Sequence, residues 1–249
     1  MKSTAIRCVL EAGNLLMKNF SRVKSVEIKK KTSLVTNVDF ESDRLIKKII
    51  HSKFPSHNIV SEESDIIDNG SDYTWHIDPV DGTHNYARCL PFFGVSVALE
   101  FRKKVILGAI NLPYLKRVHF AEKGKGAFCN GKRIRVSDRK NLDFSFIILD
   151  FNSRSRQKSA GIVKKLSSTL VDIRNFGCAV YGLTEVANGN IDAYIIQKTN
   201  SWDIAASFLL IEEAGGRVTN HKNNEWSIDE PAFLASNGRL HESLIKILK

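Results

Sequence analysis

The sequence has only four cysteines, and they are far apart in the chain: Cys8, Cys89, Cys129 and Cys178. Because no C-x-x-C pair is present, zinc fingers and dithiol redox motifs are not expected. This cysteine usage is typical of a reducing compartment, where disulfides are rare. We therefore expect a cytoplasmic protein.

The sequence also lacks long hydrophobic runs. No stretch approaches the roughly 18 consecutive apolar residues that a membrane-spanning helix needs. The first twenty residues include Arg7, Glu11 and Lys18, and these charges interrupt what would be the apolar core of a secretory signal. We expect neither a membrane span nor a secretory leader.

Positive charge is in excess but is not concentrated. The 249 residues carry a formal net charge of +10, which can attract nucleic acid, anionic lipid or a phosphorylated substrate. Short basic clusters occur at 29–31 and 102–104, and the other basic residues are scattered. No recognised nucleic-acid-binding motif accompanies the charge, so a dedicated nucleic-acid function is disfavoured. The length allows one large domain or two fused lobes.

The first half of the chain reads as helices followed by strands. Apolar residues recur at helical spacing over 5–20 and 40–54, and the second helix should end before Pro55. Short strands are indicated at 93–101, 105–111, 117–121 and 126–129. The runs at 102–104 and at Asn130-Gly131 favour hairpin turns. These signals predict a mostly antiparallel sheet.

Strands and helices alternate from about Asn141 onward. We expect strands at 146–149, 191–196 and 233–235, and helices at 156–170, 181–187, 202–214 and 240–248. Gly189 and the Gly215-Gly216 pair are typical helix ends. This alternation is typical of an α/β lobe.

The most informative segment is 75–85, with the sequence WHIDPVDGTHN. It places Asp78 and Asp81 around Pro79, which stiffens the turn. Gly82 allows a ligand to approach the backbone, and a helix beginning at Thr83 would aim free N–H groups at an anion. Carboxylate oxygens suit Mg²⁺ better than zinc. The segment predicts a site for divalent metal and phosphate, although a surface turn can have the same composition.

Two further acidic places support a metal site. Glu62-Glu63 follows a short apolar run, and Asp203 stands at the start of a strongly apolar helix. Taken alone, the glutamate pair is typical of a solvated face. Asp203 taken alone is typical of a helix cap.

With these residues in order, the sequence resembles the inositol monophosphatase family. The matching blocks are LVTNVD at 34–39, SEES at 61–64, DPVDGTHN at 78–85, GCA at 177–179, and WDIAA at 202–206 with EAGG at 213–216. They occur in the family's order and span most of the chain. The resemblance implies an α+β fold, a layered αβαβα sandwich of the inositol monophosphatase / fructose-1,6-bisphosphatase type. An N-terminal α+β lobe, 1–140, would carry most metal ligands. A C-terminal α/β lobe, 141–249, would carry Asp203 and the substrate-side segment, so that both form one catalytic unit.

The resemblance also implies the metal ligands, which are Glu62, Asp78, Val80, Asp81 and Asp203. Glu62, Asp78 and the Val80 carbonyl would hold one Mg²⁺. Asp78 would bridge to a second Mg²⁺ held with Asp81 and Asp203. Four converging carboxylates would repel one another strongly without cations. Two or three ions are expected, since the residue after Glu62 is either an outer partner or a ligand of a third, weaker ion.

The catalytic pair implied by the resemblance is Asp39 and Thr83. The substrate phosphate would lie on the amides of Gly82 and Thr83, and water would attack it directly, without a phosphoenzyme. The Thr83 hydroxyl would touch the water while Asp39 accepts from Thr83. From the residues alone, Asp39 is explained equally well as a helix cap. The cluster Lys29, Lys30 and Lys31 could add positive potential, but the alignment does not choose among the three lysines.

The substrate-binding residues implied by the resemblance are Asp81, Gly82, Thr83, Gly177, Cys178, Ala179 and Asp203. Cys178 stands where the family usually has a hydroxyl residue, and its thiol is a weaker donor. It is explained equally well as an ordinary buried cysteine. His84 replaces a more usual threonine, and a solvent-exposed place for it is favoured over a phosphate contact.

The largest departure from the family lies at Ile196, seven positions before Asp203. Inositol-specific members have a glutamate there that binds sugar hydroxyls. An apolar side chain cannot make that bond, and an unpaired hydroxyl would cost about 1–3 kcal/mol. The adjacent Gln197 would face the other side of a strand unless the loop that follows shifts by one residue.

We therefore expect a Mg²⁺-dependent phosphomonoesterase that acts on a small phosphorylated alcohol, by default inositol monophosphate. Histidinol phosphate, fructose 1,6-bisphosphate and 3′-phosphoadenosine 5′-phosphate are the alternatives. Bacterial proteins similar to this family also serve as RNA-associated or transcription-complex factors, and the +10 charge is compatible with such a role. The resemblance further implies a homodimer and lithium sensitivity. A pseudoenzyme is disfavoured because every expected metal carboxylate is present.

Overall fold

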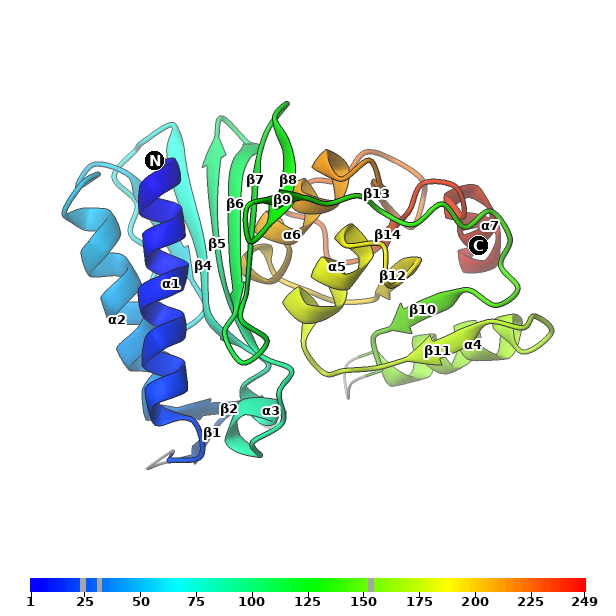
Figure 1. Cartoon of the computed structure of the whole chain (residues 1–249), viewed down its shortest axis with the longest axis horizontal. Helices are drawn as coiled ribbons and strands as arrows, with labels where there is room; N and C mark the ends of the chain where they lie inside the picture. Colours follow the sequence, from blue (N-terminus) through cyan, green and yellow to red (C-terminus); the bar gives the residue numbers. More distant parts are fainter. Residues whose placement is uncertain (23–25, 31–32, 152–154) are drawn as a thin grey trace.

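The chain folds into layers in which two β-sheets are separated and flanked by helices (Figure 1). This is a computed structural model that describes residues 1–22, 26–30, 33–151 and 155–249, with the backbone alone at 26–30 and 33–34. The expectation about Lys29, Lys30 and Lys31 lies outside the described side chains. The predicted αβαβα order is confirmed.

The larger sheet has the strand order β3-β4-β5-β6-β7-β8-β9. Its strands are β3 (Asn58–Ser61), β4 (Tyr73–Asp81), β5 (Gly94–Phe101), β6 (Lys104–Leu112), β7 (Arg117–Glu122), β8 (Gly126–Cys129) and β9 (Lys132–Arg133). β3 runs parallel to β4, and the other neighbours are antiparallel. Both predicted hairpins are confirmed, with positive φ at Arg102 and Lys103 and at Asn130 and Gly131.

Helices α1 (Lys2–Asn19) and α2 (Asn37–His51) cover one face of this sheet (Figure 1). Their buried apolar residues pack with Trp75 and Ile77 of β4 in one hydrophobic cluster. Because alternate residues of a strand face opposite sides, His76 and Asp78 point to the other face. That face is covered by α6 (Ser201–Glu213), whose Ser201 contacts His76. The strand thus has an apolar side and a polar, site-forming side.

The smaller sheet has the order β11-β10-β12-β14-β13 and is mixed. Its strands are β10 (Phe146–Leu149), β11 (Asp172–Arg174), β12 (Ala193–Ile196), β13 (Arg217–Asn220) and β14 (Phe233–Ser236). α5 (Ala179–Ala187) and α6 lie between the two sheets, and α4 (Arg156–Leu166) and α7 (His241–Leu248) pack on the outer face (Figure 1). A small hairpin, β1 (Val26–Lys30) and β2 (Ser33–Thr36), precedes α2.

The structure differs from the sequence prediction in a few elements. α4 ends at Leu166 rather than at 170, because the Ser167 and Thr169 side chains donate back to the carbonyls of Lys164 and Leu166. The short strands β11 and β13 were missed, since pairing with neighbours rather than local pattern stabilises strands of three or four residues.

The core links the two parts of the chain that the sequence assigns to separate lobes. Ile204 and Phe208 of α6 belong to the same hydrophobic cluster as Ala98 and Ile110 of the larger sheet. The division into 1–140 and 141–249 therefore stays a prediction. Among the described residues, no helix combines the length and the apolarity that a membrane crossing requires.

Candidate metal and phosphate site

Asp78 stands where β4 leaves its regular pairing with β5. It still pairs with Ser96, but the register shifts before Asp81 pairs with Gly94, and such a bulge re-aims side chains. The Asp78 side chain is 1% exposed. Its Oδ1 accepts from the Val80 amide at 3.0 Å, whereas Oδ2 has no hydrogen-bond partner among the residues described. A buried carboxylate oxygen left in this state is unfavourable.

Gly82 turns the chain from β4 into the short helix α3 (Thr83–Ala87). It has φ 85°, and a Cβ there would lie 2.6 Å from the Phe92 carbonyl oxygen. Both constraints select glycine. The prediction that a helix begins at Thr83 is confirmed.

Asp81 is held against the start of α5. Its Oδ2 accepts from the Val180 amide at 2.6 Å and from the Cys178 thiol at 3.1 Å. The helix dipole favours a negative charge at this end of α5. Cys178 is 3% exposed and lines the pocket. The two interpretations offered for Cys178 are thus compatible, because it is a buried cysteine whose thiol reaches an acid of the site.

Asp203 caps α6 and also faces the acidic cluster. Its Oδ2 accepts from the Asn200 amide and from the Thr199 hydroxyl, both at 3.0 Å. The cap interpretation is correct, and it leaves the residue within reach of the other carboxylates. Oxygen atoms of Glu62, Asp78 and Asp203 lie within 4.8 Å of one another.

Asp39 also combines a helix-capping contact with a contact to another residue of the site. Its Oδ2 accepts from the Thr36 amide at 3.0 Å in the capping box of α2, and its Oδ1 accepts from Thr83 Oγ1 at 2.9 Å. Thr83 Oγ1 is also 3.0 Å from the Val80 carbonyl oxygen. Burial raises the pKa of Asp39, and the hydrogen bonds from Thr36 and Thr83 oppose that rise. The cap and the Asp39–Thr83 contact therefore coexist.

The electrostatics of the cluster favour a cation. Burial raises the pKa of Asp78 well above its ordinary value, and the negative charges of Glu62, Asp81 and Asp203 raise it further. Burial, followed by the charge of Asp203, raises the pKa of Asp81 to about 6. Converging oxygen donors, mutual repulsion and the unpartnered Asp78 Oδ2 together fit a hard divalent ion such as Mg²⁺.

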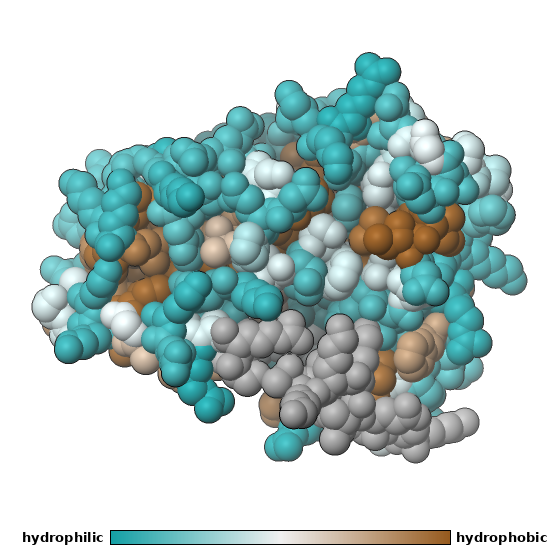
Figure 2. Space-filling model, turned by 180° about the vertical axis from the view of Figure 1, so that it is seen from behind, coloured by the Kyte–Doolittle hydropathy of each residue, from teal (hydrophilic) through white to brown (hydrophobic). Residues whose placement is uncertain are grey.

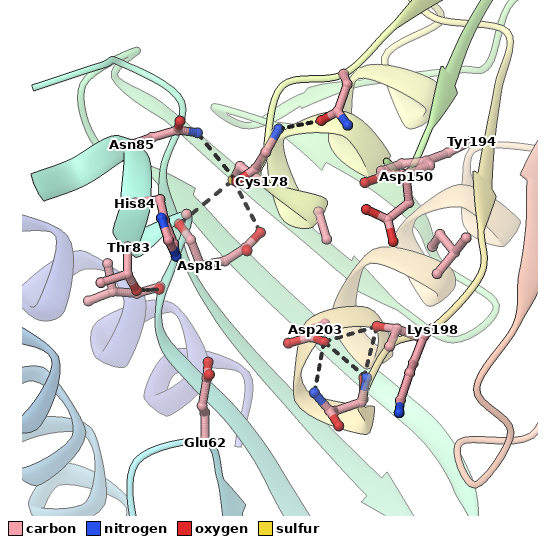
Figure 3. Close-up of a pocket in the computed structure, with 18 of the residues that line it drawn as sticks. Glu62, Asp81, Thr83, His84, Asn85, Asp150, Cys178, Tyr194, Lys198 and Asp203 are labelled. Atoms are coloured by element: carbon pink, nitrogen blue, oxygen red, sulfur yellow. Dashed lines mark hydrogen bonds between the residues drawn. The ribbon is translucent and has the colours of Figure 1, made fainter. Parts of the chain in front are cut away.

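Three of these acids border a cavity of about 490 Å³ (Figure 3). Glu62, Asp81 and Asp203 come from different elements and point toward a common space (Figure 3). The Val80 residue, Gly82 and Thr83 also line the cavity, as does the segment 177–179. Asp78 lies behind this surface, and Glu63 is not among the lining residues.

The opposite side of the cavity is formed by residues that sequence reasoning did not single out. They are Asp150, Phe151, Asn175, Tyr194 and Lys198. Asp150 directly follows β10, and Tyr194 lies on β12, which runs parallel to β10. Since neighbouring parallel strands end at the same edge of a sheet, the acid after the buried run at 146–149 was a usable signal.

Ile196 lines this side of the cavity and is 3% exposed. Gln197 is buried and is absent from the cavity wall. The loop therefore does not shift by the one residue that would bring Gln197 into the site. His84 lines the mouth of the cavity and is exposed, as favoured from the sequence.

Comparison with known proteins is consistent with this geometry. The model of the inositol monophosphatase family matches residues 1–249. A fructose-1,6-bisphosphatase/inositol-1-monophosphatase of Aquifex aeolicus is 36% identical over 249 residues, covering 96% of this chain and 92% of that protein. The Nus factor SuhB of Escherichia coli is 33% identical over 251 residues, covering 98% and 94%.

Solved structures show the same fold. The chain matches an inositol monophosphatase of Thermotoga maritima with a TM-score of 0.89 and 34% identity, covering 98% of this chain and 94% of that one. It matches an inositol monophosphatase of Anabaena with a TM-score of 0.88 and 31% identity, covering 99% and 94%. The likeness extends over the whole length of the chain rather than over the site alone.

Proposed function

This chain belongs to the inositol monophosphatase family, and we propose that it hydrolyses phosphomonoesters of small alcohols with divalent metal ions. The observation that carries the proposal is the cluster of Glu62, Asp78 and Asp203, in which a buried carboxylate oxygen lacks any partner within the described structure. The cluster opens onto a cavity large enough for a small phosphate ester.

The proposed metal ligands are those named from the sequence. Glu62, Asp78 and the Val80 carbonyl would hold one ion, and Asp78, Asp81 and Asp203 a second. Bound Mg²⁺ lowers the pKa of a coordinated water and offsets charge on the phosphoryl oxygens. Magnesium is favoured over zinc because the donors are oxygens and no histidine or cysteine is in the cluster of described residues.

The chain's own contribution begins with Asp39 and Thr83. A carboxylate can only accept hydrogen bonds, so the Thr83 proton points to Asp39 Oδ1, 2.9 Å away, or to the Val80 carbonyl. The lone pairs of Thr83 Oγ1 are then free to accept a hydrogen bond from a water in the cavity. This arrangement orients the water for attack on phosphorus.

The second contribution is the open backbone beside the acids. Gly82 leaves space where any side chain would collide with Phe92, and its N–H and that of Thr83 follow directly on Asp81. We propose that the phosphate lies on these two amides. Gly177, Cys178 and Ala179 would contact the alcohol part, since they line the same cavity.

The leaving alcohol is the least determined part of the proposal. Inositol monophosphate is the default, and the relatives named fructose-1,6-bisphosphatase/inositol-1-monophosphatase support fructose 1,6-bisphosphate as a second candidate. Histidinol phosphate and 3′-phosphoadenosine 5′-phosphate stay in the set, because Ile196 offers a hydroxyl no partner.

The test is phosphate release from a panel of these four esters, with Mg²⁺ and with EDTA, using the wild type beside Asp81→Asn. Release that needs Mg²⁺ and is lost in the variant would support the metal phosphatase. The preferred ester would name the substrate class. If the wild type releases phosphate from none of the four esters, the proposal is contradicted.

A second role in an RNA or transcription complex is supported by the +10 charge and by the relatives named Nus factor SuhB. Binding that survives Asp81→Asn and weakens steeply with salt would favour it, because contacts to phosphates release counterions. If RNA is not retained even at low salt, this role is contradicted.

Two further properties are proposed from the family resemblance. Light scattering of the protein as it leaves a size-exclusion column tests the proposed homodimer. A titration of phosphate release with lithium tests the proposed inhibition by lithium.

A further inference from the structure

A buried chain of hydrogen bonds runs between the larger sheet and the start of α6. His76 Nε2 lies 3.2 Å from Glu100 Oε2, and His76 Nδ1 lies 3.1 Å from Ser201 Oγ. His76 is 4% exposed and Glu100 is 5% exposed. The chain therefore joins β5, β4 and α6, with His76 and Glu100 buried and Ser201 partly exposed.

The chemistry of the groups fixes the direction of the contact with Glu100. A carboxylate only accepts, so His76 Nε2–H donates to Glu100. His76 Nδ1 contacts the Ser201 hydroxyl, which can either donate or accept a hydrogen bond. Each polar atom at these two contacts is matched, which is the condition for keeping a histidine and a glutamate in the core.

The chain ends beside two of the proposed metal ligands. His76 lies two residues before Asp78 on β4, so both side chains are on the same face of the strand. Ser201 lies two residues before Asp203 and is the first residue of α6. The hydrogen bond between Ser201 and His76 thus connects the two elements that bring Asp78 and Asp203 together.

Stability alone does not account for these residues. Buried ionic and polar groups are often no more stabilising than apolar residues of similar size, and they are best explained where they specify one arrangement. Here the arrangement is the placement of α6 over β4. Apolar residues of α6 already pack on the larger sheet. The Ser201–His76 contact adds one directional link at the first residue of α6, close to Asp203.

We propose that Ser201 and His76, with Glu100 behind them, are positioning residues that set the separation of Asp78 and Asp203 for a divalent cation. The inference rests on the proposed metal site. It predicts that loss of the Ser201 hydroxyl weakens the metal site without unfolding the protein. One net hydrogen bond corresponds to a loss of about 2- to 10-fold in affinity.

The experiment measures Mg²⁺ affinity by titration calorimetry on substrate-free protein, beside thermal unfolding. Ser201→Ala should weaken Mg²⁺ binding about 3- to 10-fold, and Ser201→Thr should restore it because the hydroxyl is kept. The matched control is Ser207→Ala in the same helix, since Ser207 is buried and its hydroxyl has no partner among the residues described. That control should bind Mg²⁺ as the wild type does.

A second variant keeps the test decisive if Ser201→Ala is poorly folded. The pair His76→Leu with Glu100→Leu removes both partners behind Ser201 and leaves no buried charge unmatched. It should show the same loss of Mg²⁺ affinity. In phosphate release, both variants should need more Mg²⁺ for half-maximal rate, with the substrate KM at saturating Mg²⁺ unchanged.

The outcomes separate this inference from the proposed function. If the wild type binds no divalent ion, the proposed function fails. If the wild type binds Mg²⁺ and Ser201→Ala binds it as tightly as Ser207→Ala, the positioning role fails alone. Loss of affinity that Ser201→Thr does not restore would also overturn the role, because the hydroxyl would not be its cause.

Discussion

The two sides of the cavity are built differently. The side proposed to bind metal, here called the metal side, carries Glu62, Asp81 and Asp203 around the buried Asp78, and these described side chains are all acidic. The alcohol side mixes groups of every kind, with Asp150, Phe151, Tyr194, Ile196 and Lys198. The first side gathers carboxylates, whereas the second combines acidic, basic, aromatic and apolar side chains.

This difference separates the residues expected to support the reaction from the residues expected to contact the alcohol. Like charges that converge at one place are unfavourable unless a cation joins them, so the metal side can serve few purposes. A mixed wall can fit many alcohols by small changes in shape and hydrogen bonding. We therefore expect substitutions on the metal side to remove activity and substitutions on the alcohol side to redirect it.

The largest effect is expected from neutralising one acid on each side in turn. Asp81→Asn should lower kcat/KM for every ester by at least about 100-fold, because loss of even an outer partner of a metal ligand costs about 10- to 100-fold. Asp150→Asn should change kcat by less than about threefold and alter KM in an ester-dependent way. Both are measured as phosphate release at saturating Mg²⁺. Equal losses in the two variants would break the comparison.

The next effect concerns Thr83, the residue proposed to orient water on the metal side. Thr83→Val keeps the shape but removes the hydroxyl that lies 2.9 Å from Asp39. We expect kcat to fall about 100-fold, the lower range for a lost acid–base contact, while Mg²⁺ affinity stays near that of the wild type. Thr83→Ser should recover most of the rate. A Thr83→Val protein with normal kcat would show that the hydroxyl does not touch the attacking water.

The metal side was also the more predictable one from sequence. Asp78, Asp81 and Gly82 stand within five residues, so local geometry already constrains them. Their helix and turn were expected and are present. Asp203 and Asp39 looked like ordinary caps because a cap and a site residue have the same local pattern. Only the fold shows that each capping residue also contacts the proposed site: Asp39 accepts from Thr83, and Asp203 lies beside Glu62 and Asp78.

The alcohol side depends on residues that tertiary packing brings together. Tyr194 and Lys198 are unremarkable in a sequence. The position of Asp150 after a buried strand was a usable signal, but it does not indicate which residues Asp150 faces. The link of His76 to Ser201 spans 125 positions, and pairing at such a separation leaves no trace in a single sequence. Short strands such as β11 were missed for the same reason, since their partners rather than their composition define them.

A third test measures how the converging acids of the metal side lower the free energy of unfolding when no metal is bound. The pKa of Asp81 in the folded protein is raised from 3.8 to about 6, chiefly by burial and then by Asp203. Between these values the folded, metal-free protein binds more protons than the unfolded chain. Its free energy of unfolding therefore falls as pH rises through this window. The loss is on the order of 3 kcal/mol.

The measurement is urea unfolding in EDTA at pH 4.5 and pH 7, for the wild type and Asp81→Asn. The stability difference between the two proteins should grow in favour of the variant as pH rises. Mg²⁺ at pH 7 should stabilise the wild type by mass action and reverse the order. Asp172→Asn, at an exposed position, is the control and should give a constant difference. Parallel pH curves for Asp81→Asn and the wild type would contradict the expected repulsion.

The smallest effect is expected at Ile196, on the alcohol side, where a substitution tests whether one hydroxyl of the substrate lies beside this residue. Ile196→Gln supplies a donor and an acceptor to the alcohol, and we expect kcat/KM for inositol monophosphate to rise about tenfold relative to p-nitrophenyl phosphate, since an unmatched hydroxyl costs about 1–3 kcal/mol. Ile196→Met keeps volume and apolarity and should leave that ratio unchanged. If both variants give the same ratio, no substrate hydroxyl lies at this corner. If the glutamine instead lowers turnover of the best ester in the panel, the apolar corner is itself what that substrate requires, because a polar side chain without a partner is then left in the wall.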